Sequence, residues 1–206
     1  MNNVITIGRQ CGSGGHTIGR IVAERLEIPL YDKEIIQTVA KRSGLAEETV
    51  EKEGEYSTTS LLYNVATRGI SGYDVANRDN MLLRDIVNAY QTEYIRELAE
   101  KGPCVIVGRS ADYILRNREN CLNIFIHGDL SDRVARVTEE HGVDPAEAQK
   151  HVLDRDKKRA KYYRHITDQI WGLAENYDLC LNSSKLGIDG CVELILSSCF
   201  SSSRGI

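Results

Sequence analysis

The sequence predicts an α/β protein with a mainly parallel sheet covered by helices on both faces. Short apolar runs typical of buried strands alternate with longer segments whose apolar residues have helical spacing. The run Cys-Val-Ile-Val at 104–107 contains no polar residue, as in a parallel strand with helices on both sides. A glycine-rich turn also follows the first strand. In such sheets the ligand crevice lies at the carboxyl ends of the strands.

The first strand is expected at residues 4–7, the glycine-rich turn at 8–15 and the first helix at 18–26. Backbone N–H groups at the start of a helix attract anions, and glycines let a phosphate approach the main chain closely. We therefore expect a phosphate site built from Arg9, Gly12, Ser13, Gly14, Gly15, His16 and Thr17. Such a turn could instead only let a helix pack closely on the sheet. Four glycines in eight positions favour phosphate binding over that alternative.

The turn departs from the phosphate-loop pattern G-x-x-x-x-G-K-[ST] at its side chains. If Gly14 is the last loop glycine, Gly15 stands where the lysine belongs and His16 follows it. Arg9 stands at the first glycine position. The lysine normally reaches the outer phosphates of the nucleotide. The backbone half of the site is thus present, and its side-chain half is altered.

A second strand is expected at residues 28–32, followed by a helix at 33–42 that Gly44 ends. Asp32 closes this strand, so it should lie near the glycine-rich turn at the carboxyl edge of the sheet. There it could hold a metal-bound water or a substrate hydroxyl. It could equally cap the following helix, because Asp is favoured at that position.

Further helices are expected at 46–53 and 81–101, with a mixed pattern at 57–72 between them. Since strand signals are weak there, residues 44–90 are expected to form an inserted helical lobe over the crevice. The strand at 104–107 then leads into Arg109. A guanidinium at this edge offers a planar fork to a phosphate. A salt bridge, for example to Asp112, is the alternative.

The remaining pattern is a strand at 122–127, a helix at 130–141, a helical segment at 144–168, a strand at 177–182 and a helix at 188–196. Asp144 and Pro145 form a typical helix start. Arg155 and Arg159 follow at i,i+4 spacing, where two like charges repel unless an anion compensates them. We interpret 144–168 as a phosphate-binding lid. A surface helix with Asp154 and Asp156 as counter-charges is the alternative.

Composition narrows the possible functions. The 206 residues fit a single domain, and the net charge of −4 argues against non-specific nucleic-acid binding. The six cysteines have no metal-ligand spacing, and no apolar segment follows a basic start. We expect a cytoplasmic protein without a signal peptide, a membrane span or a zinc site. Cys11 is interpreted as a small space-filling residue.

Several motifs, taken together, resemble the cytidylate kinase-like family of P-loop nucleoside monophosphate kinases. They are residues 5–16, residues 28–36, Gly108-Arg109, residues 156–159 with Tyr162-Tyr163, and residues 177–184, and they occur in family order. The resemblance implies a P-loop NTPase fold with a core, a helical lobe that binds the monophosphate and a lid. It also implies transfer of the ATP γ-phosphoryl group to a small phosphorylated acceptor such as CMP, with Mg²⁺ accompanying ATP.

Carried over by position, the resemblance places the donor phosphates on residues 12–17. It gives catalytic roles to Arg109 on the acceptor side and to Arg155 and Arg159 in the lid. It assigns no oligomeric state.

This chain departs from the family at three positions. Gly15, Val107 and Ser110 stand where cytidylate kinases carry the P-loop lysine, an acid before the Gly-Arg pair and an Asp after it. Another cation, with Arg9 and Lys33 as candidates, would have to replace the lysine. Otherwise the chain is a nucleotide-binding sensor or regulatory protein with little turnover. A kinase of a non-nucleotide small molecule is a third hypothesis.

Overall fold

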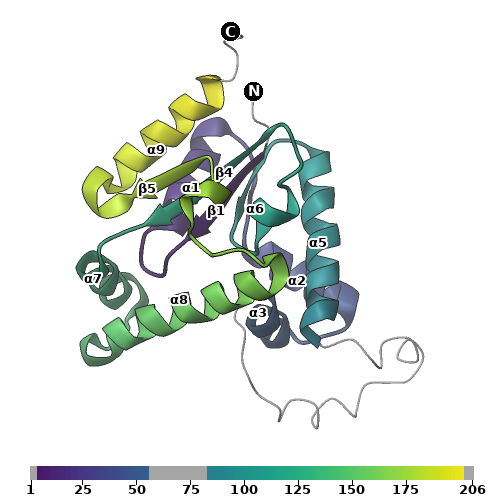
Figure 1. Ribbon diagram of the computed structural model, residues 1–206, viewed down its shortest axis with the longest axis horizontal. Coiled ribbons are helices and arrows are strands. Elements are labelled where there is room, and N and C mark those ends of the chain that lie inside the picture. Colours follow the sequence, from purple (N-terminus) through teal and green to yellow (C-terminus); the bar gives the residue numbers. More distant parts are fainter. Residues whose placement is uncertain (1–3, 56–82, 202–206) are drawn as a thin grey trace.

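The computed structural model describes residues 4–55 and 83–201, and it has the expected α/β architecture (Figure 1). Its five strands form one parallel sheet in the order β2-β3-β1-β4-β5. The strands are β1 (Val4–Arg9), β2 (Leu30–Tyr31), β3 (Cys104–Val107), β4 (Cys121–His127) and β5 (Leu179–Asn182). The predicted fold class is therefore confirmed.

The helices flank this sheet. They are α1 (Gly15–Leu26), α2 (Lys33–Ser43), α3 (Glu47–Glu55), α5 (Leu83–Lys101), α6 (Ala111–Ile114), α7 (Leu130–His141), α8 (Pro145–Thr167) and α9 (Ser183–Ser201), with a 3₁₀ turn at Ala174–Asn176. Among the described residues, no helix combines the length and apolar character needed to cross a membrane. The mixed segment 57–72, and with it the middle of the expected lobe at 44–90, lies outside the described residues.

Strands β2 and β5 are shorter than the strands expected at 28–32 and 177–182, and three helices also differ from the sequence expectation. Helix α1 begins at Gly15, earlier than expected, because Gly14 serves as its N-cap. The short helix α6 was not anticipated, since it is a single turn without its own periodic pattern. Helix α9 begins at Ser183 and includes a non-helical kink at Gly187, so that the expected helix at 188–196 is its second part.

One face of the sheet is covered by α1 and α9. Side chains alternate along a strand, so Ile5 and Ile7 of β1 and Val107 of β3 point to the same side. There they pack with apolar residues of the two helices, such as Ile18 and Ile195, all of which are buried. This cluster fixes the first helix, and with it the glycine-rich turn, against the sheet.

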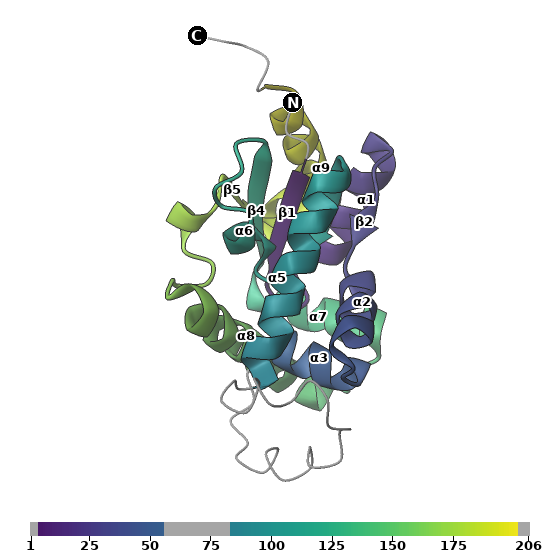
Figure 2. The same cartoon turned by 90° about the vertical axis from the view of Figure 1, so that its right-hand side faces the viewer.

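The other face is covered by α5 with α2, α3 and α6. Val4, Cys104 and Ile106 point to this side and pack with Ile95 and Leu98 of α5. Figure 2 views the molecule from the side that carries α5. The burial of strand residues on both faces explains why the strands are continuous apolar runs.

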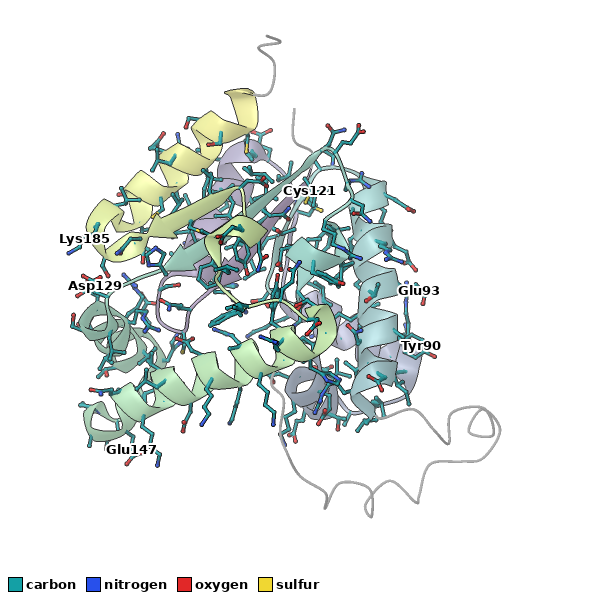
Figure 3. The ribbon with its side chains drawn as sticks, viewed as in Figure 1. Tyr90, Glu93, Cys121, Asp129, Glu147 and Lys185 are labelled. Carbon is teal, nitrogen blue, oxygen red and sulfur yellow. The ribbon has the colours of Figure 1, made fainter. Side chains whose placement is uncertain are left out.

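Helices α7 and α8 lie at the edge of the sheet where β1 ends (Figure 1). Cys11 of the turn after β1 packs with Val137 of α7 and with Ala148 and Val152 of α8. A separate contact lies at the end of β4, the neighbour of β1 in the sheet. There Lys185 of α9 pairs with Asp129 at 3.2 Å (Figure 3). The carboxyl edge is thus enclosed by helices from the second half of the chain.

Candidate active site

A cleft of about 760 Å³ opens at the carboxyl ends of β1, β2 and β3. Almost every site residue expected from the sequence lines it. These are Arg9, Gly12, Gly14, Gly15, His16, Thr17, Asp32, Arg109, Arg155 and Arg159. Segments that are far apart in the sequence therefore meet in one cavity.

The glycine-rich turn has a backbone conformation that residues with side chains rarely adopt. Gly12 has φ +74°, and a Cβ there would lie 2.3 Å from the carbonyl oxygen of Arg133. Gly14 has φ +75° and forms the N-cap of α1 without a side-chain cap. The first-turn N–H groups of a helix have no partner within the helix and point out of its N-terminus. In α1 this end borders the cleft.

Ser13 is the one expected phosphate residue that does not line the cleft. Its side chain is fully buried, and its hydroxyl donates to the carbonyl of Gln10 at 2.9 Å. Its backbone N–H donates to the same carbonyl at 3.3 Å. Ser13 therefore closes the turn from inside.

Cys11 is also buried, and burial raises the pKa of its thiol, with the neighbouring Arg159 and Arg155 acting in the opposite direction. A thiol whose pKa is raised is a weak nucleophile. This supports the interpretation of Cys11 as a space-filling residue.

Two helices hold the turn in place through polar contacts. Asp156 of α8 accepts the backbone N–H of Cys11 at 2.7 Å and pairs with Arg133 of α7 at 2.5 Å. Arg133 also donates to the carbonyl of Cys11 at 3.3 Å, and Arg136 donates to the carbonyl of Gly12 at 2.6 Å. Asp156 is thus a support of the loop rather than a surface counter-charge. Sequence reasoning missed these four contacts, because helical spacing does not reveal which charged side chain faces a distant turn.

The turn that carries Arg109 is unusual. Gly108, Arg109 and Ser110 all have positive φ, at 75°, 59° and 51°. Left-handed backbone at residues other than glycine costs free energy and is often found at functional sites. Gln91 of α5 holds the turn in place by a hydrogen bond. It is fully buried and donates to the carbonyl of Arg109 at 3.1 Å and to the hydroxyl of Tyr162 at 3.2 Å.

Asp112, suggested as a salt-bridge partner of Arg109, makes a different contact. Its carboxylate accepts the hydroxyl of Tyr163 at 2.6 Å. Burial raises the pKa of Asp112 to about 6, against the lowering effect of that hydrogen bond. Asp112 and Tyr163 thus connect the β3 turn to helix α8.

Arg155 and Arg159 lie one helical turn apart on α8, as the spacing predicts. Both line the cleft, and Arg159 is only 8% exposed. Its guanidinium donates to the carbonyl of Arg9 at 3.2 Å. The lid-like helix is therefore attached directly to the end of β1.

Asp32 occupies the N-cap position of α2, but its side chain makes no capping hydrogen bond. Its carboxylate lies 3.6 Å from the imidazole Nε2 of His16, at the margin of the cleft. Of the two roles considered for Asp32, this geometry favours the one in the site. Within the described ranges, no group of three or more His, Cys, Asp and Glu side chains could hold a metal ion.

One wall of the cleft is acidic, which the sequence did not indicate. Glu47, Glu48 and Glu51 of α3 line it, and arginines of β1, α7, α8 and the turn after β3 line other parts of the cleft. Helix α3 has the pattern of an ordinary surface helix. The packing of α3 against α2, α5 and α8 turns its acidic residues toward the cavity.

Together, the parallel sheet and the glycine-rich turn before α1 define a protein of the P-loop NTPase fold, in which arginines at the strand ends and on α8 line the cleft. The sequence pattern of the cytidylate kinase-like family matches residues 4–185. The chain belongs to this family.

Individual comparisons give one relative in sequence and two proteins of similar structure. The chain is 26% identical over 199 residues to a cytidylate kinase of Archaeoglobus fulgidus, covering 94% of this chain and 93% of the relative. An uncharacterized protein from Eubacterium ventriosum has a similar structure, with a TM-score of 0.70 and 30% identity over 98% of this chain and 99% of the other. A shikimate kinase from Bacteroides thetaiotaomicron shares the fold, with a TM-score of 0.53 and 14% identity over 95% and 97% of the two chains.

Proposed function

We propose that this protein transfers the γ-phosphoryl group of ATP to a small phosphorylated acceptor such as CMP. The observation that carries the proposal is the convergence in one cleft of the glycine-rich turn, Arg109 of the β3 turn, and Arg155 and Arg159 of α8. Phosphoryl transfer depends on positioning and on charge neutralisation more than on covalent chemistry by the protein. A glycine cradle with several guanidinium groups supplies both.

In the proposed reaction an oxygen of the acceptor phosphate forms a bond to the γ-phosphorus of ATP. The bond from that phosphorus to the bridging oxygen breaks, and its electron pair remains on the β-phosphate of ADP. A phosphate oxygen is already anionic, so this acceptor needs no general base. Arg109 would hold the acceptor phosphate, while Arg155 and Arg159 would stabilise charge on the transferred group.

The cleft also offers oxygen atoms suited to Mg²⁺, which prefers oxygen ligands and retains several waters. Thr17 and Asp32 line it. We propose that the Thr17 hydroxyl binds the ion directly and that Asp32 holds one of its waters. Mg²⁺ bound with ATP would neutralise part of the phosphate charge.

We further propose that residues 144–168 act as a lid and that residues 44–90 belong to the acceptor-binding lobe. Closure of α8 over the nucleotide would exclude water, which otherwise competes as the phosphoryl acceptor. The position of Arg155 and Arg159 of α8 in the lining of the cleft supports this role. Six free cysteines support a reducing, cytoplasmic location.

The missing P-loop lysine favours a second candidate function, a nucleotide-binding sensor or regulatory protein with little turnover. The acidic wall of Glu47, Glu48 and Glu51 favours a third candidate, a kinase whose acceptor presents hydroxyl or amino groups on that side. For a hydroxyl acceptor, Asp32 would accept the proton.

A coupled assay for ADP release, run with CMP, UMP, AMP and hydroxyl-bearing acceptors, tests these three functions. We expect release that depends on a monophosphate and that falls by about a hundredfold or more in Arg109→Ala, because a charge-assisted contact to the acceptor is lost. Arg116→Ala is the matched control. Arg116 is exposed, stacks on Tyr113 and does not line the main cleft. ATP binding without acceptor-dependent release would favour the sensor function.

A further inference from the structure

The position of the missing lysine and the position of an added arginine are in contact. Gly15 stands at the lysine position of the loop pattern, and Arg9 at the position of the first glycine. A Cβ built on Gly15 would lie 2.5 Å from Cβ of Arg9 and 3.0 Å from its Cγ. The Arg9 side chain therefore begins in the space that a side chain at position 15 would need.

This contact makes two long side chains at these positions incompatible on the present backbone. Real Cβ atoms essentially never approach other atoms within 3.0 Å, and here the neighbours are the inner atoms of Arg9 rather than its flexible end. The third neighbour, Cβ of Ile126 on β4, lies at 3.5 Å and limits any shift of Gly15 toward the sheet. A glycine at position 15 is thus the condition for an arginine at position 9.

From this exchange of residues, we propose that Arg9 is the phosphate-binding cation of this loop. Its side chain extends from the end of β1, whereas the lysine of the loop pattern extends from the first turn of α1. Arg9 and Gly15 both line the cleft. Arg9 is the last residue of β1, in register with Ile126, and its carbonyl is held by Arg159 at 3.2 Å. Its backbone is therefore anchored on both sides while its side chain passes over the start of α1.

The other candidate, Lys33, is less well placed. It begins α2 after the edge strand β2, and β3 lies between that strand and β1. Arg9 directly adjoins the N-terminus of α1, where the first-turn N–H groups would bind the β-phosphate. A guanidinium there can bind two phosphate oxygens through its planar fork, whereas the lysine that it replaces acts as a point charge.

The inference rests on the proposed function, because Arg9 needs a nucleotide phosphate to bind. During transfer, negative charge grows on the β-phosphate of ADP as the bond between the γ-phosphorus and the bridging oxygen breaks. Arg9 would stabilise this charge. Its loss should therefore lower kcat as well as nucleotide affinity.

The experiment is a calorimetric titration with Mg²⁺ and a non-hydrolysable ATP analogue, together with the ADP-release assay. Arg9→Met keeps the aliphatic stem over Gly15 but removes the charge, so folding should be preserved. We expect it to weaken analogue binding by about ten- to a hundredfold and to lower kcat by at least as much. Arg20→Ala is the matched control, since Arg20 is exposed on α1 and pairs with Glu24.

The decisive variant is the double exchange Arg9→Gly with Gly15→Lys, which restores the loop pattern. We expect it to recover binding to within about tenfold of the native protein, whereas Gly15→Lys alone loses it because the two side chains collide. If the native protein binds the analogue and Arg9→Met changes neither the affinity nor kcat, the inference is overturned and the proposed function stands. A native protein that binds no analogue would instead overturn the proposed function.

Discussion

The buried carboxyl group of Asp112 makes the stability of the folded protein depend on pH. It is 7% exposed, its pKa is raised to about 6 by burial, and its ordinary value is 3.8. Between these two values the folded state retains a proton that the unfolded state has lost. Retention of this proton stabilises the folded state. The stabilisation is therefore complete below about pH 4 and is lost as the pH rises through 6.

We expect Asp112→Asn to remove this pH dependence. Its amide oxygen can still accept the hydroxyl of Tyr163, so the contact with α8 is kept. The difference in unfolding free energy between the native protein and the variant should fall by on the order of 2–3 kcal/mol from pH 4 to pH 7. Urea unfolding at several pH values measures this difference. Parallel curves for the two proteins would contradict the assignment.

At the scale of elements, helix α3 approaches the Arg109 turn so closely that it requires a glycine. A Cβ on Gly54 would lie 2.8 Å from Oε1 of Gln91 and 3.0 Å from Nη1 of Arg109. Glycine inside a helix normally costs about 0.5–1 kcal/mol relative to alanine. Gly54 therefore lowers the stability of the helix but leaves room for the side chains of Gln91 and Arg109.

We expect Gly54→Ala to reduce phosphoryl transfer by about tenfold, because the ends of Gln91 and Arg109 must move. The gain in helix propensity should be offset by crowding against these two buried side chains and Cγ1 of Val87 at 3.3 Å, so stability should change little. Gly190→Ala in α9 is the matched control: its nearest neighbour is Cβ of Leu186 at 3.5 Å, so it should gain about 0.5–1 kcal/mol and keep full activity. Steady-state kinetics and thermal unfolding of both variants decide the matter. Equal stabilisation with native kinetics in Gly54→Ala would argue against this role of α3.

At the scale of the whole molecule, a negatively charged protein gathers several arginines in one cleft, beside the acidic residues of α3. The net charge is −4, yet Arg9, Arg109, Arg136, Arg155 and Arg159 all line one cleft. The long-range field thus does not attract anions, and binding depends on groups inside the cleft. Such contacts are screened less than charges at the surface.

We expect the affinity for Mg²⁺ with an ATP analogue to fall only a few-fold between about 0.05 and 0.5 M NaCl. Calorimetric titration across this range measures it, with the unfolding temperature of the free protein as the control for salt effects on folding. A loss of several orders of magnitude would mean that exposed charges, rather than Arg109 and Arg159 inside the cleft, dominate binding.

What the sequence by itself determined is the local pattern. Apolar runs of 4–7 residues and helical spacing predicted the order of strands and helices, and the glycines of the turn predicted its place before α1. The strand ends placed Asp32 and Arg109 at one edge. These features depend on residues a few positions apart, which is why periodicity and turn chemistry are enough to find them.

Only the tertiary structure decided how the site is supported and charged. The bond from Cys11 to Asp156 spans 145 positions, and the acidic wall of α3 and the space shared by Arg9 and Gly15 arise from packing. A charged residue on a helix has the same local pattern whether it faces water or a phosphate loop. The apolar stripe of a helix sets which face meets the core, but which distant element its charged side chains then meet depends on the packing of the whole chain.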